Sequence, residues 1–146
     1  MALKGYQQLS GTHGYFWLNG EQLMEVASVE AKVVPQREDV QLGLDVDSKI
    51  VSLKGEGSFK LLKFFSRGKK ELINAWRRGE DPRMQFVSAV KDPGAVGKQT
   101  ERVVINGAWL NEVTLTAWER GARMEEEYPF GFPASELEIP DEINPA

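Results

Sequence analysis

The 146-residue chain contains no cysteine and only one histidine, His13. The lack of cysteine excludes a disulfide scaffold, thiolate zinc sites and a cysteine nucleophile. A single imidazole in the stretch "SGTHGY" makes a poor metal site, and a loop histidine without a chemical role is the simpler interpretation. We therefore expect neither a metal nor a cofactor.

Long apolar runs are also missing. No stretch approaches the roughly 18 apolar residues that a membrane helix needs. The N-terminal "MALKGYQQLSG" has no apolar core of signal-peptide length. We expect synthesis in the cytoplasm and no membrane partner. The length is that of one domain, which predicts a single domain over residues 1–146.

Basic residues do not predominate. The chain has 18 lysines and arginines against 22 aspartates and glutamates, and its formal net charge is −4. A protein that grips nucleic-acid phosphates needs a basic surface, so this balance argues against that class. It is compatible with a surface that nucleic acid must slide past.

Alternation of apolar and polar residues with a period of two runs through most of the sequence and predicts strands with one buried face. Asn19-Gly20, between two apolar runs, predicts a tight hairpin turn. Pro35 is expected to end the strand that follows. A strand is predicted over 84–90. The longest strand-like segment covers residues 100–121. Asn106-Gly107 could be a turn or a bulge, and Trp109, which keeps the alternation, favours a bulge or a straight passage.

The most unusual predicted element is a long hairpin over about residues 37–60, with a polar turn near 45–49. Four apolar residues are expected to share one face of its first part: Val40, Leu42, Leu44 and Val46. Six residues are expected on the polar faces of its two strands: Asp39, Gln41, Lys54, Glu56, Ser58 and Lys60. Gly55 and Gly57 interrupt an apolar face, so we expect weak packing and mobility in isolation. Exposed edges of this length favour pairing with another chain, hence an oligomer.

One helix is predicted, over residues 66–79. Ser66 is a plausible N-cap. Leu72, Ile73 and Trp76 form an apolar stripe at helical spacing, and Gly79 can supply the C-terminal turn. The acidic, proline-containing tail at 133–146 is expected to be an extended arm.

The stretch "MEEEYPFGF", from Met124 to Phe132, raises the question of acid–base chemistry. In a strand, Glu126 would share a face with the aromatic residues, whereas Glu125 and Glu127 would point the other way. The three carboxylates would then not converge on a substrate, and no partner base is visible. The residues therefore predict no catalytic site and no enzyme. They describe a mostly β protein with one packing helix.

Several segments resemble a known family: "MALKGYQQLSGTHGYFWLNGEQL", "KGEGSFKLLKFFSRGKKELINAWRRGEDP", "TERVVI" and "EEEYPFGFPASELEIPDEI". They are similar to the tail-tube, or core tail, proteins of contractile phage tails, in particular to the kind found in PBSX-type defective prophages. The resemblance covers essentially the whole chain and lies in the order of elements, without a catalytic signature.

This resemblance implies a β-sandwich or split barrel with a flanking helix. Hexameric rings would join their inner strands into one large β-barrel and stack into a tube. The hairpin would reach neighbouring subunits or the next ring through Val40, Leu42, Leu44 and Val46. The lumen candidates are the six polar residues of the hairpin: Asp39, Gln41, Lys54, Glu56, Ser58 and Lys60.

The implied partners are further copies of the chain and the sheath, tape-measure and baseplate proteins. DNA would pass through without specific binding, and the protein would reside in the tail of a virion or phage-like particle. Two alternatives remain: the tube of a headless, phage-tail-like bacteriocin that passes ions, and a monomeric ligand-binding β-barrel.

Overall fold

A computed structural model describes residues 2–66 and 68–145, and these residues form a mainly β structure with one α-helix. The strands are β1 (Gly14–Leu18), β2 (Glu21–Gln22), β3 (Val26–Leu42), β4 (Asp45–Leu62), β5 (Met84–Val90), β6 (Glu101–Leu110), β7 (Glu125–Phe132) and β8 (Leu137–Asp141). The α-helix is α1 (Lys69–Arg77), and short 3-10 turns cover Gly5–Gln7, Gly11–His13, Val96–Lys98 and Ala134–Glu136.

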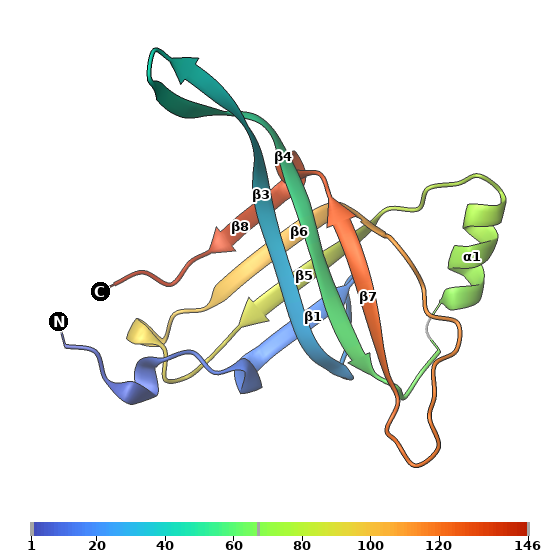
Figure 1. Cartoon of the computed structure of the whole chain (residues 1–146). Helices are drawn as coiled ribbons and strands as arrows, with labels where there is room; N and C mark the ends of the chain where they lie inside the picture. Colours follow the sequence, from blue (N-terminus) through green and yellow to red (C-terminus); the bar gives the residue numbers. More distant parts are fainter. Residues whose placement is uncertain (1, 67, 146) are drawn as a thin grey trace.

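All strand pairs are antiparallel, in the order β2-β1-β5-β6-β7-β4-β3, and β8 pairs with β6. β6 connects two layers. Its N-terminal part pairs with β5 and β8, whereas Trp109 and Leu110 pair with β7. The layer of β1, β5, β6 and β8 crosses the layer of β3, β4 and β7, with α1 to one side (Figure 1). The predicted sandwich-like β fold with a flanking helix is confirmed.

Aromatic side chains from both layers fill the space between them. Phe16 of β1 and Phe86 of β5 meet Phe59 of β4 and Phe130 of β7, with ring centroids 4.8 to 6.0 Å apart. Their exposed fractions are at most 3%. Aromatic pairs at these separations each add roughly 0.5–1.5 kcal/mol beyond the burial of apolar area. This core fixes the β3–β4–β7 layer, which carries the long hairpin.

The hairpin is longer than predicted and turns at a different place. Its strands are paired from Val26 to Leu42, and the connecting loop is Gly43-Leu44 instead of residues 45–49. Gly43 has a φ of 65°, which suits the first position of a type II′ turn. Pro35 does not end a strand, because β3 is an edge strand in which a missing N–H can face away from the ladder.

The glycines of β4 are sites of close aromatic packing, so the prediction of weak packing there was wrong. Gly55 lies opposite Phe132 and Gly57 lies opposite Phe130 in the ladder with β7. A Cβ atom at Gly57 would lie 2.3 Å from the carbonyl oxygen of Glu30 and 2.7 Å from Cζ of Phe130. The rings occupy the space that side chains at these positions would need.

We expect Gly57→Ala to lower the free energy of unfolding by about 1–3 kcal/mol, because the added methyl group overpacks a site walled by backbone. Urea unfolding curves measure this change. Gly11→Ala is the matched control, since nothing lies within 4 Å of a Cβ atom there. Equal unfolding midpoints for the two variants would contradict this account of the ring packing.

The helix is shorter at its N-terminal end than predicted. It begins at Lys69, with Gly68 as the N-cap at a φ of 53°, so Ser66 is not the cap. Residue 67, which the prediction included, lies outside the described residues. The C-terminal end is as predicted: Gly79 has a φ of 78° and closes a Schellman motif.

Two further predictions need correction. The strand-like segment predicted over 100–121 is a strand only from Glu101 to Leu110, and residues 111–124 form no regular strand. The bulge at Asn106-Gly107 is confirmed by a register shift between β5 and β6. The predicted extended arm at 133–146 instead returns to the sheet, because β8 pairs with β6.

Candidate assembly surfaces

The face of the β3–β4–β7 layer that points away from the core is polar. Four of the six lumen candidates alternate along this face of β4: Lys54, Glu56, Ser58 and Lys60. Their register partners on β3 are Val34, Lys32, Glu30 and Ser28. Phe59, which lies between Ser58 and Lys60, points into the core, so the strand separates an aromatic face from a charged one.

Two of the lysines on this face lie close to carboxylates. The Lys32 Nζ lies 3.9 Å from a carboxylate oxygen of Glu30 and 4.0 Å from one of Glu56, and the Lys54 Nζ lies 3.8 Å from the other Glu56 oxygen. Lys60 is opposite Glu127 in the ladder with β7. Exposed pairs of this kind add little to stability, about 0–1 kcal/mol each. They do, however, leave the face without a block of unpaired positive charge.

The other two lumen candidates, Asp39 and Gln41, are not on this face. The ladder between β3 and β4 is irregular near Gln36, where β4 has one extra residue and β3 has none. The side chains of β3 therefore keep alternating between the two faces past this point. Asp39 and Gln41 therefore point to the side opposite Lys32. The predicted set of six is split by the structure into four residues on one face and two on the other.

The four apolar hairpin residues do not share one face either. Val40 pairs with Asp47 and Leu42 pairs with Asp45, while Val46 pairs with Gln41 on the opposite face. The prediction was wrong because it assumed one continuous strand through Gly43-Leu44, where the chain reverses. All four are exposed, by 38% at Val40, 60% at Leu42, 67% at Val46 and fully at Leu44.

Two strand edges of the same layer have no partner among the described residues. β3 is the last strand of the sheet, so its outer edge is free along 17 residues. β7 pairs with β6 at Phe130 and Gly131, and its Pro129 carbonyl accepts a hydrogen bond from the Asn111 N–H, which leaves the part of that edge before Pro129 without a strand partner. Free edges of this length are templates for pairing with another chain.

A buried charge cluster lies at the start of β7. The Glu126 carboxylate, 5% exposed, accepts hydrogen bonds from Lys63, Lys69 and the Tyr128 hydroxyl. Burial by itself raises the pKa of Glu126, but these donors outweigh burial and keep the pKa below its ordinary value. Burial and the neighbouring Glu126 carboxylate raise the pKa of Tyr128. The cluster ties the segment before α1 to the sheet.

The strand interpretation of "MEEEYPFGF" is confirmed, and with it the exposure of Glu125 and Glu127. The sequence analysis missed the partners of Glu126. The sequence did indicate that Glu126 has partners, because a glutamate on an otherwise aromatic face must be paired when it is buried. Which lysines pair with it could not be predicted, since Lys63 is 63 residues away along the chain.

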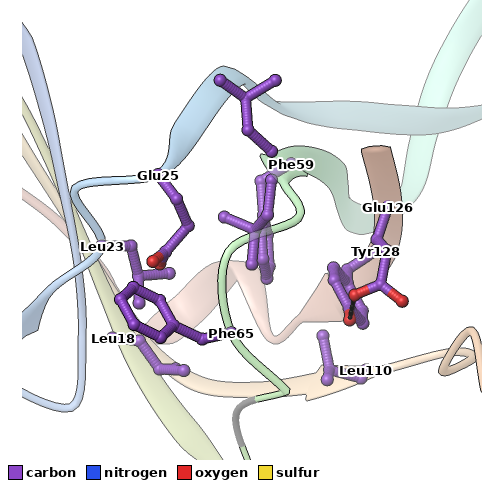
Figure 2. A pocket seen from close by; sticks show the side chains of 10 residues that line it. Leu18, Leu23, Glu25, Phe59, Phe65, Leu110, Glu126 and Tyr128 are labelled. Carbon is purple, nitrogen blue, oxygen red and sulfur yellow. Dashed lines mark hydrogen bonds between the residues drawn. The ribbon is translucent and has the colours of Figure 1, made fainter. Parts of the chain in front are cut away.

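Next to this cluster is a small cavity of about 60 Å³. In Figure 2, Glu25 and Phe65 lie on one side of it and Tyr128 with Glu126 on the other. Binding sites for small organic ligands usually measure about 300–1,000 Å³. This cavity is therefore smaller than such sites.

Two other kinds of site are absent from the part of the chain that the structure describes. Within residues 2–66 and 68–145, no group of three or more His, Cys, Asp or Glu side chains could hold a metal ion. In the same described part, no helix is long and apolar enough to cross a membrane.

Comparison with known families identifies the family of the chain. The family model described as phage tail tube protein (DUF2001) matches residues 1–141. The chain belongs to this family of phage tail tube proteins. Two curated proteins of Bacillus subtilis (strain 168) are each 26% identical to it. The phage-like element PBSX protein XkdM aligns over 99% of this chain and 98% of its own length, and the uncharacterized protein YqbM over 98% and 97%.

Solved structures share the fold of this tail tube protein. The sheath–tube complex of the extracellular contractile injection system PVC matches with a TM-score of 0.70 at 7% identity, covering 92% of both chains. The tube-terminating cap of the anti-feeding prophage AFP matches with a TM-score of 0.74 at 9% identity, covering 97% of this chain and 95% of the cap. The predicted family and its PBSX kind are confirmed.

Proposed function

We propose that the chain is the structural subunit of a contractile tail tube, in which hexameric rings stack around an open channel. Membership of the tail tube family supports this role. The observation that carries the proposal is the hairpin: β4 between Asp45 and Lys54 pairs with β3 alone, so a two-stranded ribbon projects roughly 30 Å from the sheet. An isolated two-stranded ribbon is marginally stable in water, which favours burial by other copies.

The free edges support a way to close a ring. The outer edge of β3 in one copy would pair with the unpaired part of β7 in the next, around Glu125 to Tyr128. Repeating this contact extends the β3–β4–β7 layer through every copy, and closure of the ring pairs the free edges of this layer with each other. Because the second layer covers one face of this sheet, the polar face would line the channel.

The polar face suits a conduit for DNA. Each lysine that binds a phosphate adds affinity and slows transit. Here Lys32 and Lys54 already have carboxylates within 4.0 Å. DNA would therefore pass without specific binding. The headless bacteriocin tube that passes ions remains the alternative, and capsid and terminase genes beside this gene would distinguish the two.

The expected partners are sheath, tape-measure and baseplate proteins in the tail of a phage or phage-like particle. Solved structures with this fold include a sheath–tube complex and a baseplate of contractile systems. No catalysis is needed for this role. The polar surfaces described above would serve transit and contact between proteins.

Negative-stain electron microscopy of the purified protein, fresh and after concentration, tests the proposal. We expect rings or hollow tubes, because both free edges and the ribbon need partners. Sheath and baseplate proteins should be added if the protein alone stays dispersed. Only small monodisperse particles under all these conditions would contradict a tube subunit.

A further inference from the structure

The chain contains two Asn-Gly dipeptides, Asn19-Gly20 and Asn106-Gly107, and they lie in different surroundings. An asparagine that precedes a glycine can react with its own backbone. The glycine nitrogen attacks the side-chain carbonyl carbon, and no Cβ atom on the glycine hinders the approach. Whether a folded chain reacts depends on what holds the attacking nitrogen, the carbonyl oxygen and the amide group that leaves.

At Asn19-Gly20 the reacting groups are accessible. Both residues are exposed in the turn between β1 and β2, with φ angles of 49° and 85°. Within residues 2–66 and 68–145, neither the Gly20 N–H nor the Asn19 side-chain NH₂ has a hydrogen-bond partner. A Cβ atom at Gly20 would have nothing within 4 Å, so the turn leaves room around the attacking nitrogen.

The side-chain carbonyl of Asn19, in contrast, is held by a backbone donor. The Gln85 N–H of β5 donates to Asn19 Oδ1 at 2.8 Å, and the Asn19 N–H donates to the Gln85 carbonyl at 2.8 Å. Because a backbone N–H can only donate, the amide oxygen must face Gln85. Negative charge develops on this oxygen when the Gly20 nitrogen attacks, and a donor already in place stabilises that charge.

The second dipeptide is held at both side-chain atoms. Asn106 Oδ1 accepts a hydrogen bond from Gln85 Nε2 at 2.8 Å, and Asn106 Nδ2 donates to the Glu136 carbonyl at 3.3 Å. A Cβ atom at Gly107 would overlap the Glu136 carboxylate, so this carboxylate fills the space beside the glycine. Its negative charge also opposes loss of a proton from a nearby backbone nitrogen. The same dipeptide is therefore restrained at one place and accessible at the other.

We propose that Asn19 deamidates spontaneously in the folded protein, whereas Asn106 is protected. The Gly20 nitrogen bonds to the Asn19 side-chain carbon, its proton passes through water to the departing NH₂ group, and ammonia leaves a succinimide ring. Water then opens the ring at either carbonyl and gives aspartate or isoaspartate at position 19. One carboxylate is added, so the formal net charge changes from −4 to −5. The inference does not depend on the tube role.

The two products should affect the sheet differently. Aspartate keeps the length of the turn and still accepts the hydrogen bond from the Gln85 N–H. Isoaspartate lengthens the main chain within the two-residue turn that sets the register of Leu18 with Glu21. This change displaces Leu23, which is 1% exposed and donates its N–H to the Phe16 carbonyl. Accumulation of isoaspartate should therefore lower the midpoint of urea unfolding.

Peptide mapping by mass spectrometry tests the site, after the purified protein is aged in mildly alkaline buffer with and without denaturing urea. In urea, both asparagines should deamidate at similar rates, because the dipeptide is the same. In native buffer, Asn19 should react several-fold faster than Asn106. Anion exchange should then separate a more negative species from the wild type and none from Asn19→Gln, since glutamine closes the larger ring slowly.

Asn19→Asp is the matched control for the consequence of the reaction. It should unfold at the wild-type urea midpoint, so that a lower midpoint of the aged protein reports isoaspartate. Native protein in which Asn19 stays intact for as long as it takes to react in urea would overturn the proposal. Deamidation of Asn106 as fast as that of Asn19 in native buffer would overturn it too.

Discussion

Leu42→Asp combined with Leu44→Asp should give a folded monomer that no longer forms tubes. Leu42 is 60% exposed and Leu44 fully exposed in the free subunit, so their replacement removes no core contact. The added carboxylates would enter the hairpin tip, residues 37–49, which already has four carboxylates. Burying them against another copy without partners costs several kcal/mol per contact. Repeated in every copy, this cost should stop growth completely.

Circular dichroism and thermal unfolding verify the fold of this double variant, and negative-stain microscopy scores tubes. Leu42→Met/Leu44→Met is the matched control, because it retains the apolar surface and should still assemble. Unfolding of the aspartate variant would mean that the hairpin tip belongs to the subunit's own core. Normal tubes from it would mean that the tip is not an assembly surface.

Glu126→Ala should destabilise the subunit by about 2–4 kcal/mol, because it leaves Lys63 and Lys69 without their shared carboxylate. The Tyr128 hydroxyl loses its acceptor as well. Urea unfolding at neutral pH measures the change. Glu127→Ala is the matched control, since Glu127 is an exposed neighbour in the same strand, and it should change stability by less than about 0.5 kcal/mol.

This contribution depends on pH with a defined sign. The pKa of Glu126 is lowered in the folded state from an ordinary value of 4.5. Its stabilisation is therefore fully present above pH 4.5 and is lost as the pH falls through the lowered pKa. The stability difference between wild type and Glu126→Ala should be constant near neutral pH and shrink in acid. A difference that grows in acid would contradict the ion cluster.

Local patterns predicted most of the fold. Asn19-Gly20 specified its turn because few other dipeptides accept two positive φ angles. Alternation placed Glu126, Tyr128 and Phe130 on one face of β7 because one side of a sandwich layer is always buried. Alternation misplaced the long hairpin turn, because an exposed ribbon has no buried face to specify where the strand reverses. That error then assigned Val46 to the wrong face.

The assembly surfaces depended on information that is not local. Pairing of Lys32 with Glu56, and of Gly57 with Phe130, follows from a register between distant strands. Residues 111–124 continue the alternation of β6 but form no strand, because the pairing of β6 with β7 stops at Leu110 and is followed by a single hydrogen bond from the Asn111 N–H to the Pro129 carbonyl. The exposure of Trp118 therefore became apparent only in three dimensions.

Cryo-electron microscopy of assembled tubes tests the central claim most directly, at higher detail than negative staining. We expect hexameric rings in which β3 of each copy pairs with β7 of its neighbour. Lys54, Glu56 and Ser58 should face the channel. A ring held together through β1 and β5, with the edge of β3 in solvent and Lys54 on the outer surface, would contradict it.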